Sequence, residues 1–335
     1  RRCAQQRRQQ SLDHSLAGGP MKRRFIGSLI LAATVSCGAE DGKSGLDEPF
    51  KVENAQFVEG ALPGILAGET VDDENLPTVT SPSAEVAAIT ERMAGIRFIG
   101  LSSRNAASVG VRFAESGSGY YLFPTGSIDP TDDNALTWSF IADLQQDLPP
   151  GRHEFLTVAF DEEGHAGQQA TSSLCVRSLR PDNGNACFPA VAPPAFVLSV
   201  EWDTPVDLDL VLVLPNGQVV DAKNPAPTSP DDPLSKPPAR LVYDGNGGCT
   251  IDGRQREDIV FDELPAPGRY QVYVNLARNC GEHAVTYQVS RHSRTELPND
   301  EYGVDSHDVG AGTLIADQAN GGTKRGTYVG TLTSQ

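Results

Sequence analysis

Short strand-like runs set the strongest limit on what this chain can fold into. From residue 51 onward, apolar or alternating runs of four to eight residues recur between Gly, Pro, Asn and Asp, and only 84–93 could form a short helix. Runs of this length with turn residues between them are typical of β-sandwiches. The sequence therefore predicts an all-β protein, and its 335 residues are enough for two domains.

A Pro- and Asn-rich segment over 181–195 divides the β-rich part of the chain. Because this segment has little strand potential, we place a linker there and predict two tandem Ig-like β-sandwich domains, over 51–180 and 196–291. A local repeat favours two similar domains, since 148–160 and 264–276 share a Leu-Pro turn, a Gly-Arg pair and an alternating strand.

Residues 292–335 form a polar tail. Within it only 312–316 and 327–332 look extended, and the run Asn-Gly-Gly at 320–322 lies between them. Asn-Gly between two extended runs is a strong turn signal. The sequence therefore predicts a short C-terminal hairpin in this tail.

The N-terminal residues have the composition of an export signal. Residues 1–20 are polar and basic and precede the first Met, so we interpret them as an upstream extension outside the native protein. A basic segment at 22–24 is followed by an apolar run over 25–35, which is too short to span a bilayer because a spanning helix needs about 20 residues. This order is typical of a cleaved export signal, here over 21–36.

The sequence Thr-Val-Ser-Cys at 34–37 resembles the lipobox of bacterial lipoproteins, with Thr34 where that pattern usually has Leu. The resemblance implies that Cys37 is lipidated and that 37–50 form a disordered tether. It implies contact with the membrane through the lipid anchor only. Gly38 rather than Asp follows the cysteine, which favours the outer membrane, with the protein facing the periplasm or the cell surface.

Acidic residues outnumber basic ones. The whole chain carries 27 Lys and Arg against 44 Asp and Glu; without 1–36, which hold seven basic residues and one acid, 20 face 43, a net charge of −23. A body with this charge is repelled by nucleic-acid phosphates and by anionic lipid. We therefore expect no nucleic-acid partner, and an envelope or extracellular ligand of unknown identity.

Four cysteines follow the lipobox, and they agree with an oxidising compartment: Cys175, Cys187, Cys249 and Cys280. Four cysteines allow three pairings. Proximity along the chain favours disulfides between Cys175 and Cys187 and between Cys249 and Cys280. A zinc site is not expected, because no CxxC motif occurs.

Acidic side chains gather at the entrance of one very apolar strand. In the run WDTPVDLDLVLVLPNG, which begins at Trp202, the side chains of Asp203, Asp207 and Asp209 share one parity of an extended chain, and the strand's first apolar residues share the other. A second acidic segment, over 244–258, begins with Asp-Gly-Asn, as calcium-binding loops do. The two segments together predict a candidate cation site.

The second segment is not an EF-hand, because Cys249 replaces the obligatory Gly and Gln255 replaces the final Glu. A calcium site of another type needs about six to eight oxygen ligands. The candidate metal ligands are Asp207, Asp209, Asp244, Asp252, Glu257 and Asp258. The alternative is that these acids face water or pair with Arg240, Arg254 and Arg256.

Enzyme signatures are absent from the sequence, which contains no HExxH, GxSxG, P-loop or GxGxxG motif. Ser306, His307 and Asp308 are adjacent, whereas the members of a catalytic triad converge from separate elements. His165 lies in a turn after a predicted strand, where a solvated histidine is the simpler interpretation. We therefore assign no catalytic residues and expect no enzymatic activity.

The run LSVEWDTPVDLDLVLVLPNGQVV, which begins at Leu198, resembles the signature of YfaP-like β-sandwich domains, a family of bacterial envelope and secreted proteins with no established activity. REDIVF at 256–261 and PGRYQVYVNL at 267–276 are similar to the family's downstream block. The likeness covers about 198–290. Residues 51–195 resemble the Ig-like domain that accompanies this domain in some envelope lipoproteins.

A more distant likeness concerns the calcium-binding domain of tellurium-resistance proteins, which also combines Asp-Leu-Asp with a later acidic pair. Here Asp207 and Asp209, followed by Glu257 and Asp258, occupy the similar positions. This resemblance favours Ca²⁺ as the cation.

These observations predict a non-catalytic exported lipoprotein of the cell envelope, a binding or structural module stabilised by calcium. The alternative function is a carbohydrate- or peptide-binding accessory module of secreted hydrolases. That alternative requires exposed aromatic side chains on one face, whereas a structural role places them in the core. The candidates are Tyr120, Tyr121, Trp138, Tyr270 and Tyr273.

Overall fold

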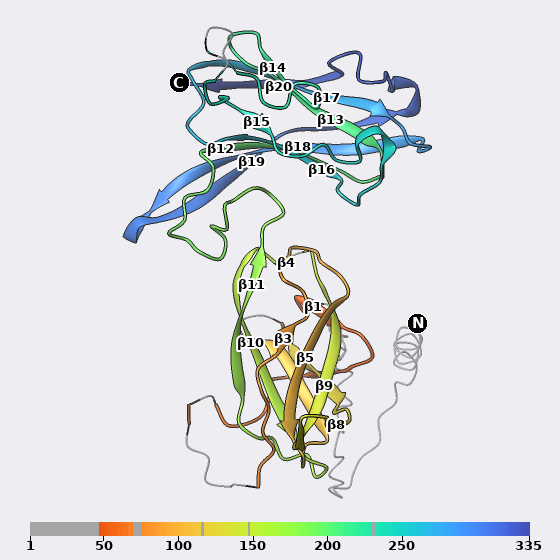
Figure 1. Cartoon of the computed structure of the whole chain (residues 1–335), viewed down its shortest axis with the longest axis vertical. Coiled ribbons are helices and arrows are strands. Elements are labelled where there is room, and N and C mark those ends of the chain that lie inside the picture. The colour runs from red at the N-terminus through yellow and green to blue at the C-terminus, as the bar shows by residue number, and fades with distance from the viewer. Residues whose placement is uncertain are drawn as a thin grey trace, which may run out of the picture. The chain divides into compact units, whose positions relative to one another are not determined.

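The computed structural model describes residues 47–335 apart from 67, 70–74, 115–116, 147, 229–231 and 233. Over these residues the regular structure consists of β-strands and three short 3₁₀ segments, so the predicted all-β class is confirmed (Figure 1). Within the same residues, no helix is long and apolar enough to cross a membrane. The predicted signal, Cys37 and most of the tether lie outside the described residues.

The strands of 50–177 form two sheets that enclose the larger of two apolar clusters, and we call this part the N-terminal sandwich. One sheet has the order β1-β9-β5-β3, with β8 beside β9, and the other has the order β2-β7-β6-β10-β11-β4. The strands are β1 (Phe50–Val52), β2 (Gln56–Glu59), β3 (Ser83–Ala84), β4 (Ile89–Thr90), β5 (Ile96–Ser103), β6 (Ser108–Phe113), β7 (Gly119–Pro124), β8 (Ile128–Asp129), β9 (Asp132–Leu144), β10 (Gly151–Phe160) and β11 (Ala170–Arg177).

Stacked aromatic rings join the two sheets of the N-terminal sandwich. Phe98 on β5 and Phe140 on β9 lie 5.7 and 6.0 Å, centroid to centroid, from Phe155 on β10 in the facing sheet. The short helix considered for 84–93 is not formed, because β3 and β4 pair with β5 and β11 instead.

The strands of 196–334 form the second pair of sheets, which we call the C-terminal sandwich. One sheet has the order β15-β16-β12-β18-β19 and the other β14-β13-β17-β20. The strands are β12 (Phe196–Trp202), β13 (Asp207–Val213), β14 (Val219–Val220), β15 (Arg240–Leu241), β16 (Arg256–Phe261), β17 (Gly268–Arg278), β18 (Ala284–Leu297), β19 (Glu301–Ile315) and β20 (Thr327–Ser334). Their inner faces form one apolar cluster, in which Leu208, Leu210 and Leu212 meet Leu198 and Val200.

The tail is part of the C-terminal sandwich, and the prediction of a separate C-terminal hairpin is wrong. β19 pairs with β18 along its whole length, and β20 pairs with β17 in the other sheet. The two strands therefore extend different sheets, with a 3₁₀ turn (Ala316–Gln318) between them. The extended run expected at 327–332 corresponds to most of β20, whereas of β19 only the end at 312–315 was expected, because much of that strand is exposed and polar.

Both favoured disulfides are present, with Cα–Cα distances of 5.7 Å for Cys175–Cys187 and 5.4 Å for Cys249–Cys280. The local repeat has a structural basis as well. It places Gly151 and Gly268 at the first positions of β10 and β17, with φ of +152° and +150°. Such φ values favour glycine, so the repeat records the same strand entrance in each sandwich.

Candidate functional site

Two aspartates at the entrance of β13 lie at the centre of the candidate site. The leucines of β13 face the core, so the side chains of Asp207 and Asp209 leave the opposite face of the sheet, as their parity predicts. Their exposed fractions are nevertheless only 5% and 8%. Surrounding loops and the neighbouring strand β17 therefore bury two carboxylates on the outer face of this sheet.

Asp244 completes a group of three carboxylates. Asp207, Asp209 and Asp244 each offer an oxygen, and these oxygens all lie within 4.8 Å of one another. Asp244 comes from the loop before β16, whose chain reverses at Asn246 with φ of +56°. The structure thus brings together three of the six predicted ligands from segments about 35 residues apart, consistent with a site that could hold a metal ion.

Neutral donors hold the two β13 carboxylates in place. The backbone N–H of Gly248 donates to Asp207 at 3.0 Å, and the side-chain amide of Asn275 donates to Asp209 at 3.0 Å. The Cys249–Cys280 disulfide fastens the loop that carries Gly248 to the turn after β17. No ion pair with a basic side chain reaches these two carboxylates among the described residues.

The electrostatics of the group show excess negative charge. Burial raises the pKa of Asp209 to about 6, and the charges of Asp207 and Asp244 add to this effect against the lowering by Asn275. Burial also raises the pKa values of Asp207 and Asp244, and for Asp207 this effect exceeds the lowering by the Gly248 N–H and by the charge of Arg278. A raised carboxyl pKa means that neighbouring positive charges and hydrogen bonds do not offset the cost of burying the ionised form. A bound cation would stabilise that form.

Glu257 supports the group from the other sheet. Its side chain is fully buried, and it accepts hydrogen bonds from the backbone N–H of Leu210 at 2.7 Å and of Gly245 at 3.3 Å. It is also hydrogen-bonded to Asp244, and burial raises the pKa of Glu257 well above its ordinary value. A neutral Glu257 can donate its proton to Asp244, so this residue positions the loop.

Asp252 and Asp258, also predicted as ligands, are not brought into the group. Asp252 is exposed, is hydrogen-bonded to the Tyr243 hydroxyl, and accepts the backbone N–H of Arg254 at 2.8 Å. Asp258 points to the face of β16 opposite Glu257, where it pairs with Arg256 at 2.7 Å. For Asp258 the alternative of arginine pairing therefore holds, because adjacent strand residues face opposite ways.

A polar cavity of about 260 Å³ opens in front of the three carboxylates. Asp221 and three basic residues, Lys223, Arg278 and Lys324, line it together with the acids, and Lys223 is hydrogen-bonded to the backbone carbonyl of Gly322. Sequence reasoning missed these residues. Asn275, which also lines the cavity, was missed as well, although it stands out in the sequence as a polar residue at the end of the apolar alternation of β17.

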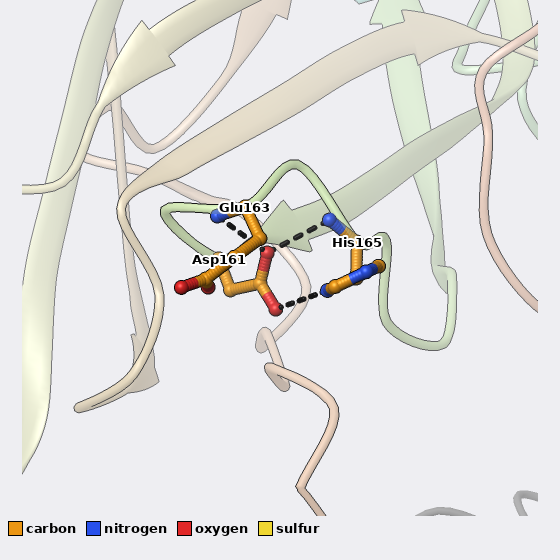
Figure 2. Close-up of side chains that lie close together, drawn as sticks. All are labelled: Asp161, Glu163 and His165. Atoms are coloured by element: carbon orange, nitrogen blue, oxygen red, sulfur yellow. Dashed lines mark hydrogen bonds and ion pairs between the residues drawn. The ribbon is translucent and has the colours of Figure 1, made fainter.

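A second acidic group lies in the turn after β10, and Figure 2 shows its three side chains, Asp161, Glu163 and His165. Asp161 accepts the backbone N–H groups of Glu163 at 3.1 Å and of His165 at 2.7 Å, and its other oxygen lies 2.9 Å from Nδ1 of His165. Asp161 thus closes the turn, and His165 is exposed, as the sequence indicated.

Four of the five aromatic residues that a carbohydrate-binding face would need are buried. They are Tyr120, Tyr121, Trp138 and Tyr270. Tyr273 is partly exposed and packs against Tyr328, with ring centroids 5.4 Å apart. Tyr121, Trp138 and Tyr270 match the core interpretation, and Tyr120 is buried in a smaller apolar cluster with Leu62.

No protein-family model and no curated protein matches the chain. Among solved structures it is similar to dimeric latent PorU from Porphyromonas gingivalis, with 12% identity, 72% of this chain and 20% of that chain covered, and a TM-score of 0.23. The α-L-rhamnosidase of Streptomyces avermitilis is 12% identical, with 73% of this chain and 26% of that chain covered and a TM-score of 0.21. CfaE, the adhesive subunit of the CFA/I fimbria of enterotoxigenic Escherichia coli, is 8% identical, with 81% of this chain and 94% of that chain covered and a TM-score of 0.15.

The chain therefore spans about a fifth of PorU and a quarter of the rhamnosidase. Likenesses with TM-scores this low carry no argument about function, so the functional argument depends on the site itself.

Proposed function

We propose that this protein is a non-catalytic, exported lipoprotein of the cell envelope whose C-terminal sandwich binds one Ca²⁺ ion through Asp207, Asp209 and Asp244. The ion stabilises the loop end of the sandwich, which acts as a binding or structural module. The observation that carries the proposal is the convergence of three carboxylates with oxygens within 4.8 Å of one another, two of them buried and neither of these two in an ion pair among the described residues.

The chemistry of the donors supports calcium over a transition metal. All three side chains offer carboxylate oxygens, and neither histidine nor cysteine belongs to the group. Hard cations prefer such ligands, and Ca²⁺ tolerates irregular geometry with backbone carbonyls and water completing its shell. The cation would offset the charge that burial leaves uncompensated at Asp209.

Export is supported by two observations. Both disulfides of the mature region are formed, as is usual in an oxidising compartment. The segment over 21–37 has the order of an export signal followed by a lipobox-like cysteine. Replacement Cys37→Ser is expected to move the protein from the membrane fraction to the soluble exported fraction, and unchanged membrane association would contradict lipidation at this residue.

Thermal unfolding tests the calcium site directly. A ligand at 100 times its dissociation constant adds about 2.7 kcal/mol to the stability of the folded state, so millimolar Ca²⁺ should raise the unfolding midpoint relative to chelator. Asp209→Asn and Asp244→Asn should each abolish most of the rise. Asp203→Asn is the matched control, because Asp203 shares the strand entrance but accepts the backbone N–H of Thr286 at 2.9 Å. A midpoint that ignores Ca²⁺ in the unmodified protein would overturn the proposal.

A further inference from the structure

A second cavity, of about 330 Å³, lies at the other end of the strands of the C-terminal sandwich. Leu212 near the end of β13, Phe261 at the end of β16 and Tyr270 near the start of β17 line it, whereas the carboxylate group occupies the start of β13 and the end of β17. The two sites therefore lie at opposite ends of these strands and share no lining residue.

The cavity is mostly apolar. Phe196 and Tyr270 each pack edge-on against Phe261, with ring centroids 5.6 and 5.9 Å apart, and Leu332 of β20 also lines the space. Leu264, in the loop between β16 and β17, lines the same cavity and is 79% exposed. An exposed leucine beside an apolar cavity extends the apolar surface available to a ligand.

Arg291 places a charge on the inner face of the sheet at this cavity. Val285, Tyr287 and Val289 of β18 point into the core, and strand alternation puts Arg291 and Ser293 on the same face. The register agrees, because Arg291 lies directly opposite the core residue Leu198 on β12. The core face of β18 thus changes from apolar to cationic where the cavity begins.

The guanidinium of Arg291 has no hydrogen bond or ion pair to any residue in the described part of the chain. The other arginine of the cavity, Arg294, is already engaged: it donates to the carbonyl of Pro193 at 3.3 Å and stacks over the Tyr302 ring. A partly buried guanidinium without a partner is costly, and a carboxylate satisfies it with charge-assisted hydrogen bonds.

We propose that this cavity binds a small amphipathic carboxylate, an aliphatic or aromatic acid whose apolar part contacts Phe261, Tyr270 and Leu264 and whose carboxylate pairs with Arg291. The volume is near the lower end of the range of ligand pockets, about 300–1,000 Å³, which restricts the ligand to a short chain or a single ring. The combination of apolar walls with one convergent cation distinguishes this ligand class from neutral apolar molecules.

Octanoate and 1-octanol form a suitable pair of probes, because they share an apolar chain and differ in charge. Binding to the full chain is measured by titration calorimetry at pH 7.5 with Arg291→Met, which keeps most of the side-chain length without the charge. Octanoate is expected to bind at least about tenfold more tightly than octanol, a difference of about 1.4 kcal/mol. Arg291→Met should remove that difference and leave octanol binding unchanged.

Two further variants complete the test. Arg269→Met is the matched control, because Arg269 is an exposed arginine of the same sandwich outside the cavity. Leu264→Ser should weaken both probes, and because Leu264 is exposed, its replacement leaves the packed core intact. The proposal is overturned if octanoate does not bind the unmodified protein, if Arg291→Met binds it as tightly, or if octanol binds equally well. It is also overturned if Leu264→Ser leaves the binding of both probes unchanged.

Discussion

Glu257 and Leu210 join the two sheets of the C-terminal sandwich through one hydrogen bond, in which the backbone N–H of Leu210 donates to the Glu257 carboxyl at 2.7 Å. Glu257 belongs to β16 in one sheet and Leu210 to β13 in the other. At Leu210 the Glu257 carboxyl accepts the backbone hydrogen bond that a neighbouring strand would otherwise accept, since β14 pairs only with Leu212 and Val213. It also fixes the strand that presents Asp207 and Asp209.

Glu257→Gln tests whether this carboxyl is neutral in the folded protein. Because burial raises the pKa of Glu257, the amide resembles the protonated acid; it can still accept from Leu210 and donate to Asp244. We expect a change in unfolding free energy of no more than about 1 kcal/mol for Glu257→Gln. Glu257→Ala leaves the N–H of Leu210 unsatisfied beside a cavity and should cost about 2–4 kcal/mol. Urea denaturation at pH 7 gives both values, and equal losses would contradict a neutral Glu257.

The raised pKa of Asp209 predicts a pH dependence with a definite sign. A carboxyl with a pKa of about 6 in the folded state and about 3.9 in the unfolded state stabilises the fold fully below pH 4. That contribution disappears as the pH rises through 6, and it amounts to about 2–3 kcal/mol. In chelator, the unfolding free energy of the unmodified protein should therefore fall relative to Asp209→Asn between pH 4 and 7. Saturating Ca²⁺ should remove most of this fall, because the cation stabilises the charged form. A parallel pH profile for the two proteins in chelator would show that Asp209 is not perturbed.

Some parts of the fold and of the site were predictable from two simple rules, the alternation of side chains along a strand and proximity along the chain. The parity of β13 placed Asp207 and Asp209 on one face, and nearness along the chain selected both disulfides. The same alternation shows that Glu257 and Asp258 point to opposite faces of β16, so they cannot both join one group. Which of the two turns inward depends on the neighbouring strand, and the sequence holds no local signal for it.

Residues that reach the site from distant segments were not predictable. Asn275, Lys223 and Lys324 meet Asp209 at the cavity only because β17 pairs with β13 and the loops after β14 and β19 return to the same end. The register of two strands about 65 residues apart is a tertiary property. Most of β19 and the pairing of β20 were missed for a related reason, since edge strands with exposed polar faces lack an apolar alternation.

The Cys249–Cys280 disulfide is predicted to support cation binding as well as stability. It closes a loop of 31 residues, for which the chain-entropy model gives about 3–4 kcal/mol. It also restrains Gly248, the donor to Asp207. Replacement of both cysteines by serine should lower the unfolding midpoint and weaken Ca²⁺ binding measured by calorimetry.

The Cys175–Cys187 disulfide serves as the control for this prediction. It lies outside the C-terminal sandwich and closes a shorter loop, of 12 residues, so its removal should cost about 3 kcal/mol without changing the affinity for Ca²⁺. Equal weakening of Ca²⁺ binding by both double replacements would mean that general loss of stability, rather than loop restraint, is responsible.

The final prediction concerns the ion pair between Asp258 and Arg256, which is not part of the cation site. Arg256 also contacts Glu201 and donates to Ser199 at 2.7 Å, so this partly buried network lies on the outer face of β16. Arg256→Met leaves Asp258 buried without its partner and should destabilise the fold by about 3–5 kcal/mol, whereas the double variant Arg256→Met with Asp258→Asn should recover part of that loss. Neither variant should change the shift in midpoint that Ca²⁺ produces, measured by thermal unfolding with and without chelator. Loss of the calcium response in Asp258→Asn alone would return Asp258 to the ligand set and contradict the placement of the site around Asp207, Asp209 and Asp244.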